Sequence, residues 1–368
     1  MRRLLASLSP LLLLVSACGS GGDGGGGGGG GGPTPTPAQA TTMYVRISGD
    51  DTNDGLAPER AFRTLQRAAK DISAGDVVYV GPGRYGAPPV TNPPPIAALD
   101  ILNAAGSAAQ PIQILADVTG DHTGDPAGEV VIDGKDVALS LRISKSSYVI
   151  VDGFVIQRGK GNNGAGVQVR NLSSQITLRN CIVTDNIDGI RVENSTDVTL
   201  FNNLIYENSS RGIRLSGAPH TRIINNTIVH NQDRGVSVGG ANANGVGSID
   251  CALQNNIIQD NSNVSIAVDD GPPSSLIDYD GNFNLVFYAR LADQTKTYRP
   301  ASVMGGDDIN LDAQFIDPGF ALDQQNSPAV DAGTASIDGN LLSELFKRST
   351  ASNGSSDKPP VDLGYHSR

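Results

Sequence analysis

The chain has 368 residues, including 45 Gly and 21 Pro, with no Trp and aromatic residues at only 5%. This length fits two domains of ordinary size or one long repeat domain. The formal net charge of −11 argues against a general nucleic-acid-binding function, because such proteins need a basic surface to contact phosphates. Beyond residue 17, no apolar run approaches the roughly 20 residues needed to cross a bilayer.

The N-terminus predicts an export signal. Arg2 and Arg3 precede the apolar stretch 4–15, which is too short for a stable membrane span. Residues 15–18, Val-Ser-Ala-Cys, resemble the bacterial lipobox, whose cysteine is acylated and becomes the mature N-terminus. We therefore expect a signal peptide at 1–17 and lipidation of Cys18. An ordinary signal peptide cleaved nearby, with Cys18 idle, is the alternative.

Residues 18–42 predict a flexible tether. Positions 19–32 are almost all glycine and 33–37 alternate Pro and Thr, so the segment lacks the apolar residues that a folded core needs. A tether is useful when one end is anchored, which favours a lipid at Cys18. We expect a protein held on the bacterial cell envelope by that lipid alone. The outer membrane or cell surface is the expected site, with a periplasmic orientation as the alternative.

The segment that follows predicts the first strands and one helix. Residues 44–45 and 77–80 carry the β-branched and aromatic side chains typical of strands. Between them, apolar residues recur at helical spacing and would share one helix face. These residues are Phe62, Leu65, Ala69 and Ile72.

From residue 141 the sequence repeats with a period near 23 residues, and each unit holds three short apolar strands separated by corners. One corner of each unit begins with an asparagine, at Asn180, Asn202, Asn225 and Asn255. Six residues later a second asparagine occurs, at Asn186, Asn208, Asn231 and Asn261. Asparagine tolerates the left-handed backbone of corners, and stacked asparagines can hydrogen-bond along a ladder.

A unit of this length cannot bury its apolar face alone, whereas a stack of units forms a continuous core. Leucine-rich repeats share the period but need a fuller leucine signature, and propeller blades need about twice the length. The repeats and the opening at 44–80 resemble right-handed parallel β-helix proteins of the pectate-lyase-like class. The resemblance implies an all-β fold, with the β-helix at 43–285, an N-terminal capping helix and an irregular closing segment at 286–368.

The third strand of each unit has its apolar residues turned inward, so the residue between them faces outward. Along the stack this outward column reads Arg142, Gln168, Arg191, Arg214, Ser237 and Ala267. The residues before the strand glycines add Asp188, Arg211 and Arg234. Arginine is suited to bidentate contacts with carboxylate or sulfate, so both sets are candidate substrate contacts. The alternative is ordinary surface arginines paired with Asp188, Glu193 and Asp233.

Two insertions flank that column. Residues 159–164 lengthen one corner, and residues 239–245 lengthen the opposite corner three coils further on. Insertions on one face of a repeat protein usually build the wall of its binding site. We therefore expect a groove for a chain-like ligand.

Lyases of the resembled class remove a proton next to a carboxylate with Lys or Arg, while Ca²⁺ or another basic residue neutralises the acid group. The resemblance implies Lys160 as the base beside Arg191 and Arg214, since a lysine close to other cations loses its proton more easily. No dense acidic set matches the calcium site of the family, which leaves Asp269 and Asp270 as metal candidates. A turn before Gly-Pro-Pro is the alternative role of this pair.

We expect a monomer that binds an acidic polysaccharide along the 142–214 face, with cleavage or epimerisation as the further activity that Lys160 would supply. A surface adhesin or scaffold without catalysis is the alternative, because one fold hosts both. Hydrolysis would need two facing carboxylates, for which Asp188 and Asp233 are weak candidates.

Overall fold

The structure is a computed structural model and describes residues 39–86, 96–136, 139–161, 164–241, 245–269, 271, 274–289, 297–316 and 319–367. Strands dominate these residues, together with two short α-helices, α1 (Leu65–Ala69) and α2 (Gly339–Leu345), and 3-10 turns at Pro58–Arg60 and Ala301–Val303. No helix in the described ranges is long and apolar enough to cross a membrane.

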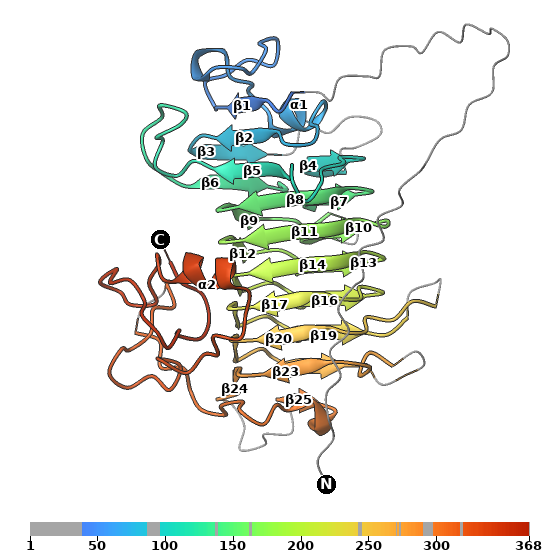
Figure 1. Ribbon diagram of the computed structural model, residues 1–368, viewed down its shortest axis with the longest axis vertical. Coiled ribbons are helices and arrows are strands. Elements are labelled where there is room, and N and C mark those ends of the chain that lie inside the picture. Colours follow the sequence, from blue (N-terminus) through green and yellow to red (C-terminus); the bar gives the residue numbers. More distant parts are fainter. Residues whose placement is uncertain are drawn as a thin grey trace, which may run out of the picture. The chain divides into compact units, whose positions relative to one another are not determined.

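The strands form three sheets, A, B and C, in which every neighbouring pair is parallel (Figure 1). Sheet A contains β1 (Thr42–Val45), β2 (Val77–Val80), β5 (Ile112–Ala116), β8 (Ser147–Asp152), β11 (Ser174–Arg179), β14 (Thr196–Phe201), β17 (Arg222–Ile224), β20 (Ala252–Gln254) and β23 (Asp280–Asn282). Sheet B contains β3 (Gly83–Gly86), β6 (Val130–Asp133), β9 (Val155–Gln157), β12 (Ile182–Thr184), β15 (Leu204–Tyr206), β18 (Thr227–Val229), β21 (Ile257–Gln259) and β24 (Leu285–Phe287). Sheet C contains β4 (Ala97–Leu102), β7 (Leu139–Ser144), β10 (Ala165–Arg170), β13 (Asp188–Glu193), β16 (Ile213–Ser216), β19 (Val236–Gly239), β22 (Ile266–Val268) and β25 (Tyr298–Arg299).

Each regular coil contributes one strand to each sheet, and pairing joins residues one repeat apart. Leu178 pairs with Leu200, and Leu200 pairs in turn with Ile223. The inward side chains of successive coils make one continuous buried core. The expected all-β parallel β-helix is therefore confirmed.

The corner asparagines predicted from the repeat have left-handed backbone. Asn180, Asn202, Asn225 and Asn255 have φ angles of 56°, 52°, 52° and 58°. Their side chains form an outer row, in which Asn202 Nδ2 donates to Asn180 Oδ1 at 2.8 Å. The second predicted ladder is buried, and its successive amides are bonded, as Asn208 Nδ2 donates to Asn231 Oδ1 at 2.9 Å.

A third ladder, which the sequence analysis missed, consists of Asn203, Asn226, Asn256 and Asn284. Asn226 is fully buried, and its Nδ2 donates to the carbonyls of Leu200 and Ile224 and to Asn256 Oδ1, at 2.9–3.1 Å. Its Oδ1 accepts from both the backbone N–H and the side-chain amide of Asn203. Every polar atom of this side chain is thus used inside the coil stack.

Helix α1 is shorter than the sequence predicts. It begins after Thr64, whose side chain accepts the Arg67 N–H, and only Leu65–Ala69 is helical. Phe62 is buried but precedes the helix and forms a bridge with Val45. Because an extended N-cap residue separates Phe62 from the helix, helical spacing does not describe its position. The capping role of α1 stays a prediction.

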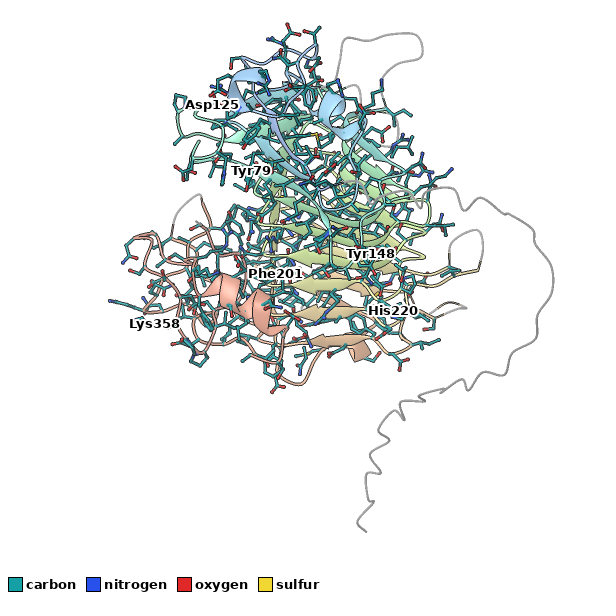
Figure 2. All side chains as sticks on the ribbon, turned by 45° about the horizontal axis from the view of Figure 1, so that its top comes forward. Tyr79, Asp125, Tyr148, Phe201, His220 and Lys358 are labelled. Atoms are coloured by element: carbon teal, nitrogen blue, oxygen red, sulfur yellow. The ribbon has the colours of Figure 1, made fainter. Side chains whose placement is uncertain are left out.

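The C-terminal part of the chain folds back against the outer sides of sheets A and B. Strand β25 still pairs with β22, so strand pairing continues past the expected boundary at residue 285. Beyond it, α2 lies close to Phe201 on the outer side of sheet A (Figures 1 and 2). Its Leu345 shares a buried cluster with Phe201 of β14 and Ile224 of β17. This packing buries an apolar patch that would otherwise face solvent.

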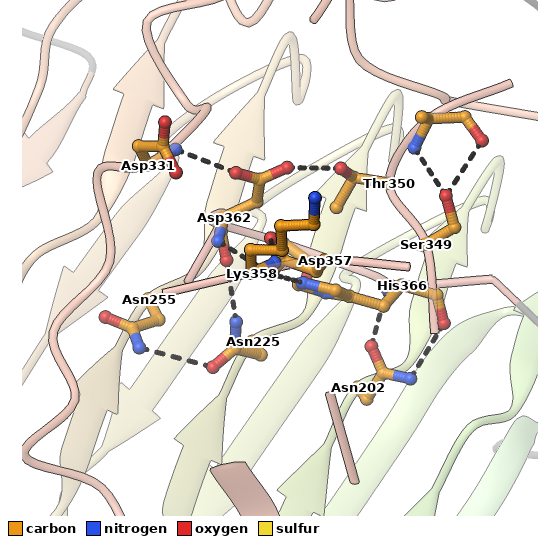
Figure 3. Close-up of polar contacts among 12 residues, drawn as sticks. Asn202, Asn225, Asn255, Asp331, Ser349, Thr350, Asp357, Lys358, Asp362 and His366 are labelled. Carbon is orange, nitrogen blue, oxygen red and sulfur yellow. Dashed lines mark hydrogen bonds and ion pairs between the residues drawn. The ribbon is translucent and has the colours of Figure 1, made fainter. Parts of the chain in front are cut away.

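The outer asparagine row bonds to the backbone of this C-terminal segment (Figure 3). Asn202 accepts the N–H of His366 at 2.6 Å and donates to its carbonyl at 3.0 Å. Asn225 donates to the carbonyl of Asp362, and Asn255 exchanges two bonds with the backbone of Thr334. The corner asparagines therefore position the closing segment as well as the turns.

Candidate functional site

The outer face of sheet C carries the column of residues that the repeat predicts. The register confirms it: each residue pairs with the next along the stack, in the order Asp100, Arg142, Gln168, Arg191, Arg214, Ser237, Ala267 and Arg299. The two end residues, Asp100 and Arg299, were missed because β4 and β25 lie outside the regular repeat. A second column is made by Asp188, Arg211 and Arg234, because the carbonyls of Arg211 and Arg234 accept the N–H groups of Gly189 and Gly212, the residues that follow Asp188 and Arg211.

Long connections occur at both ends of the strands of sheet C. Residues 158–164 join β9 of sheet B to β10 of sheet C, and residues 240–251 join β19 of sheet C to β20 of sheet A. One connection therefore precedes a strand of sheet C and the other follows a strand of sheet C, so they are at opposite ends of the strands, as the sequence predicts. The outer face of sheet C is the surface between them.

The N-terminal part of the column is neutralised by carboxylates. Arg142 binds Asp100 through two bonds, at 2.8 and 2.5 Å, and its side chain is only 13% exposed. Gln168 is buried and donates to Glu193 at 3.0 Å. Arg142 and Gln168 therefore already have protein partners, and their predicted contact with substrate stays a prediction.

Arg191 and Asp188 form a buried ion pair. Arg191 is 2% exposed, and its Nε and Nη2 bind Asp188 Oδ2 at 3.1 and 2.7 Å. Burial acts to raise the pKa of Asp188, but the bond and charge of Arg191 hold it below its usual range. Neither side chain reaches the surface, so the predicted catalytic role of Arg191 and substrate role of Asp188, which stay predictions, would require this pair to open.

Lys160 has carboxylate neighbours rather than the cations expected from the sequence. Its Nζ lies 2.5 Å from Asp185 Oδ1 and 3.6 Å from Asp136 Oδ1. The hydrogen bond to Asp185 and the two negative charges raise the pKa of Lys160, despite a smaller opposing effect of burial. The physical basis for Lys160 as a general base was wrong, because this environment keeps the amine protonated.

The C-terminal part of the face differs in charge. Arg214 is half-buried, and its side chain forms no hydrogen bond or ion pair within the described part of the chain. Arg211 has one long contact, from Nε to Asp233 Oδ2 at 3.4 Å. Arg234 donates to the Ser237 hydroxyl at 3.2 Å, and no described carboxylate pairs with it. Positive charge is thus left unneutralised at this end of the column.

Asp269 forms a turn at the end of β22. Its Oδ2 accepts the N–H of Gly240 and its Oδ1 accepts the N–H of Gly271, both at 3.0 Å. Among the described residues, no group of three or more His, Cys, Asp or Glu is arranged to hold a metal. Asp270 lies outside the described residues, as does Cys18, so the calcium site and the lipidation site stay predictions.

Comparison with known proteins agrees with this architecture. Residues 133–278 match the family described as right handed beta helix region, while curated proteins gave no significant match. Among solved structures, the pectate lyase Pel9A is 15% identical over 82% of this chain and 94% of its own, with a TM-score of 0.50. The GH136 lacto-N-biosidase from Eubacterium ramulus is 14% identical over 67% of this chain, with a TM-score of 0.47. The chain spans 56% of the length of that lacto-N-biosidase.

At this identity, the similarity to Pel9A shows the fold alone. Together with the strand pairing, it makes this chain a right-handed parallel β-helix repeat protein. The ligand has to be argued from the outer face of sheet C itself.

Proposed function

We propose that the outer face of sheet C binds an acidic polysaccharide. The observation that carries the proposal is Arg214, a half-buried guanidinium without a described partner in the middle of a face bounded by long connections. The chain has a net charge of −11, so unpaired arginines gathered on one face make that face locally more positive than the chain as a whole. Guanidinium groups recognise carboxylate and sulfate oxygens through paired hydrogen bonds.

The shape of the face supports an extended ligand. The column rises by one coil for each strand of sheet C, roughly 4.8 Å at a time, so its residues lie in a straight row. A chain of sugars can follow such a row and contact several coils. The fold relative Pel9A is a pectate lyase, which is consistent with a polysaccharide ligand.

Binding is favoured over cleavage at the residues named from the sequence. A lyase base must be unprotonated, whereas the carboxylates around Lys160 raise its pKa. Arg191 would have to leave Asp188 before it could contact a substrate. The buried carboxylate of Asp188 would then have no cationic partner, which is energetically costly. The function supported by the described geometry is therefore recognition.

Replacing Arg214 with Gln should weaken binding to a polyuronate at least about tenfold, since a charge-assisted hydrogen bond contributes about 1.5–3 kcal/mol. Arg222→Gln is the matched control, because Arg222 is an exposed arginine of the next coil on sheet A. Titration calorimetry with polygalacturonate, alginate and a neutral glucan gives the comparison. Equal affinity of the wild type and Arg214→Gln, or no preference for acidic polymers, would refute the proposal.

We also propose that the protein is held on the bacterial cell envelope through a lipid on Cys18. The support is the lipobox-like Val-Ser-Ala-Cys and the glycine-rich stretch behind it, which would let the β-helix reach away from the membrane. Cys18→Ala should move the protein from the detergent phase to the aqueous phase in Triton X-114 partition. Retention of the variant in the detergent phase would contradict the anchor.

A further inference from the structure

A cavity of about 520 Å³ lies at the C-terminal end of the sheet C face. The residues that matter for its chemistry are Arg234, Ser237, Ala267, Asp269 and Arg299. They come from β19, β22 and β25 and from the residues at the ends of these strands, so three successive coils build the cavity. It continues the column of Arg214 toward the C-terminal end of the stack.

Two guanidinium groups line this cavity without a carboxylate partner in the described chain. Arg234 Nη1 donates to the Ser237 hydroxyl, while its Nε is shielded from solvent and has no hydrogen-bond partner among the described residues. Arg299 is exposed and pairs in register with Ala267, whose small side chain leaves space beside it. A shielded donor without an acceptor is costly unless a ligand supplies one.

The charges around Arg234 are not balanced by the protein. Burial, together with the like charges of Arg211 and Arg299, lowers the pKa of Arg234, although Asp233 and Asp269 oppose the shift. The guanidinium groups that line the cavity therefore repel one another. An anion placed among them would relieve this repulsion and also accept from the free Nε.

Asp269 restricts the kind of anion that fits. Its carboxylate is fixed in the cavity wall by the N–H groups of Gly240 and Gly271. This negative charge repels an anion on its own side but accepts hydrogen bonds from hydroxyl groups. A ligand that carries an oxyanion and hydroxyls on one ring satisfies both sides.

We propose that this cavity binds the oxyanion substituent of a sugar, with Arg234 and Arg299 on the oxyanion and Asp269 on an adjacent hydroxyl. The proposal rests on the proposed function in that it places one acidic residue of the polysaccharide at the C-terminal end of the row. Both a uronic carboxylate and a sulfate ester have the required chemistry. The cavity itself can be tested without a polymer.

The test is titration calorimetry of the intact protein at low ionic strength with glucuronate, galactose 6-sulfate and uncharged galactose. We expect the wild type to bind at least one of the two anionic sugars at least tenfold more tightly than galactose. The tighter anionic ligand identifies the source as uronate or sulfate ester. Arg234→Gln and Arg299→Gln should each weaken that ligand about tenfold, and Arg222→Gln should leave it unchanged.

Arg299 is exposed, so Arg299→Gln keeps the test valid even if Arg234→Gln is destabilised. Unchanged affinity in Arg299→Gln, or equal affinity of the wild type for galactose and both anionic sugars, would overturn the cavity proposal. If anionic monosaccharides bind here while Arg214→Gln leaves the affinity for the polymer unchanged, the cavity proposal is supported and the proposed function is refuted. If the affinity for the polymer depends on Arg214 but not on Arg234 or Arg299, the proposed function is supported and the cavity proposal is refuted.

Discussion

Asn226→Ala should lower the free energy of unfolding by about 2–4 kcal/mol, because several buried polar groups would lose their partners at once. The carbonyls of Leu200 and Ile224 would lose a donor, and both nitrogens of Asn203 would lose an acceptor. Water cannot replace the amide readily, since Asn226 and Asn203 are both fully buried. Each buried polar group left without a hydrogen-bond partner lowers the free energy of unfolding by about 1–3 kcal/mol if the surrounding structure does not adjust.

Urea denaturation followed by circular dichroism measures this loss, with Asn263→Ala as the control. Asn263 is exposed, and within the described residues its side-chain amide bonds to the side chain of Asp233 alone. We expect the control to change stability by less than about 0.5 kcal/mol, as surface substitutions usually do. Similar effects of the two substitutions would show that the inner ladder does not stabilise the coil stack.

The inner ladder also shows what the sequence could and could not predict. Its residues follow the predicted corner asparagines directly, as in the pair Asn225-Asn226. The repeat predicts a corner here, but it cannot say which amide of the pair turns inward. Left-handed backbone at Asn225 turns its side chain toward the C-terminal segment, and Asn226 then faces the coil interior. The doubled asparagine was the signal that could have identified both ladders.

The candidate site was predicted in position but not in charge. Alternation along the third strand placed Arg142, Arg191 and Arg214 in one column, and the register confirms this. Alternation carries no information about ion pairs across coils. The partner of Arg142 is Asp100, 42 residues earlier on β4, a strand that lies outside the regular repeat. The repeat therefore locates a surface, whereas the packing of neighbouring coils decides which of its charges are free.

Leu345→Ala should lower the free energy of unfolding by about 2–5 kcal/mol, the usual range for removing a fully buried leucine side chain. Leu345 of α2 is 0% exposed and belongs to a small cluster with Phe201 and Ile224, which lie on the outer side of sheet A. A cavity at this contact would weaken the attachment of α2, because the cluster is separate from the main core. Leu311→Ala is the control, since Leu311 is 58% exposed.

Urea denaturation gives the stability change, and limited proteolysis shows where it acts. We expect Leu345→Ala to be cut first within residues 319–367, because the coil stack keeps its own ladders and core when α2 loosens. Wild-type stability in the variant, or cleavage that begins within the coils, would contradict the packing of α2 on sheet A. The outer faces of sheets A and C also differ in role. The C-terminal segment covers Phe201 and Ile224 on sheet A, while the unpaired arginines lie on sheet C, so the variant should lose stability yet keep the sugar affinity of the folded protein.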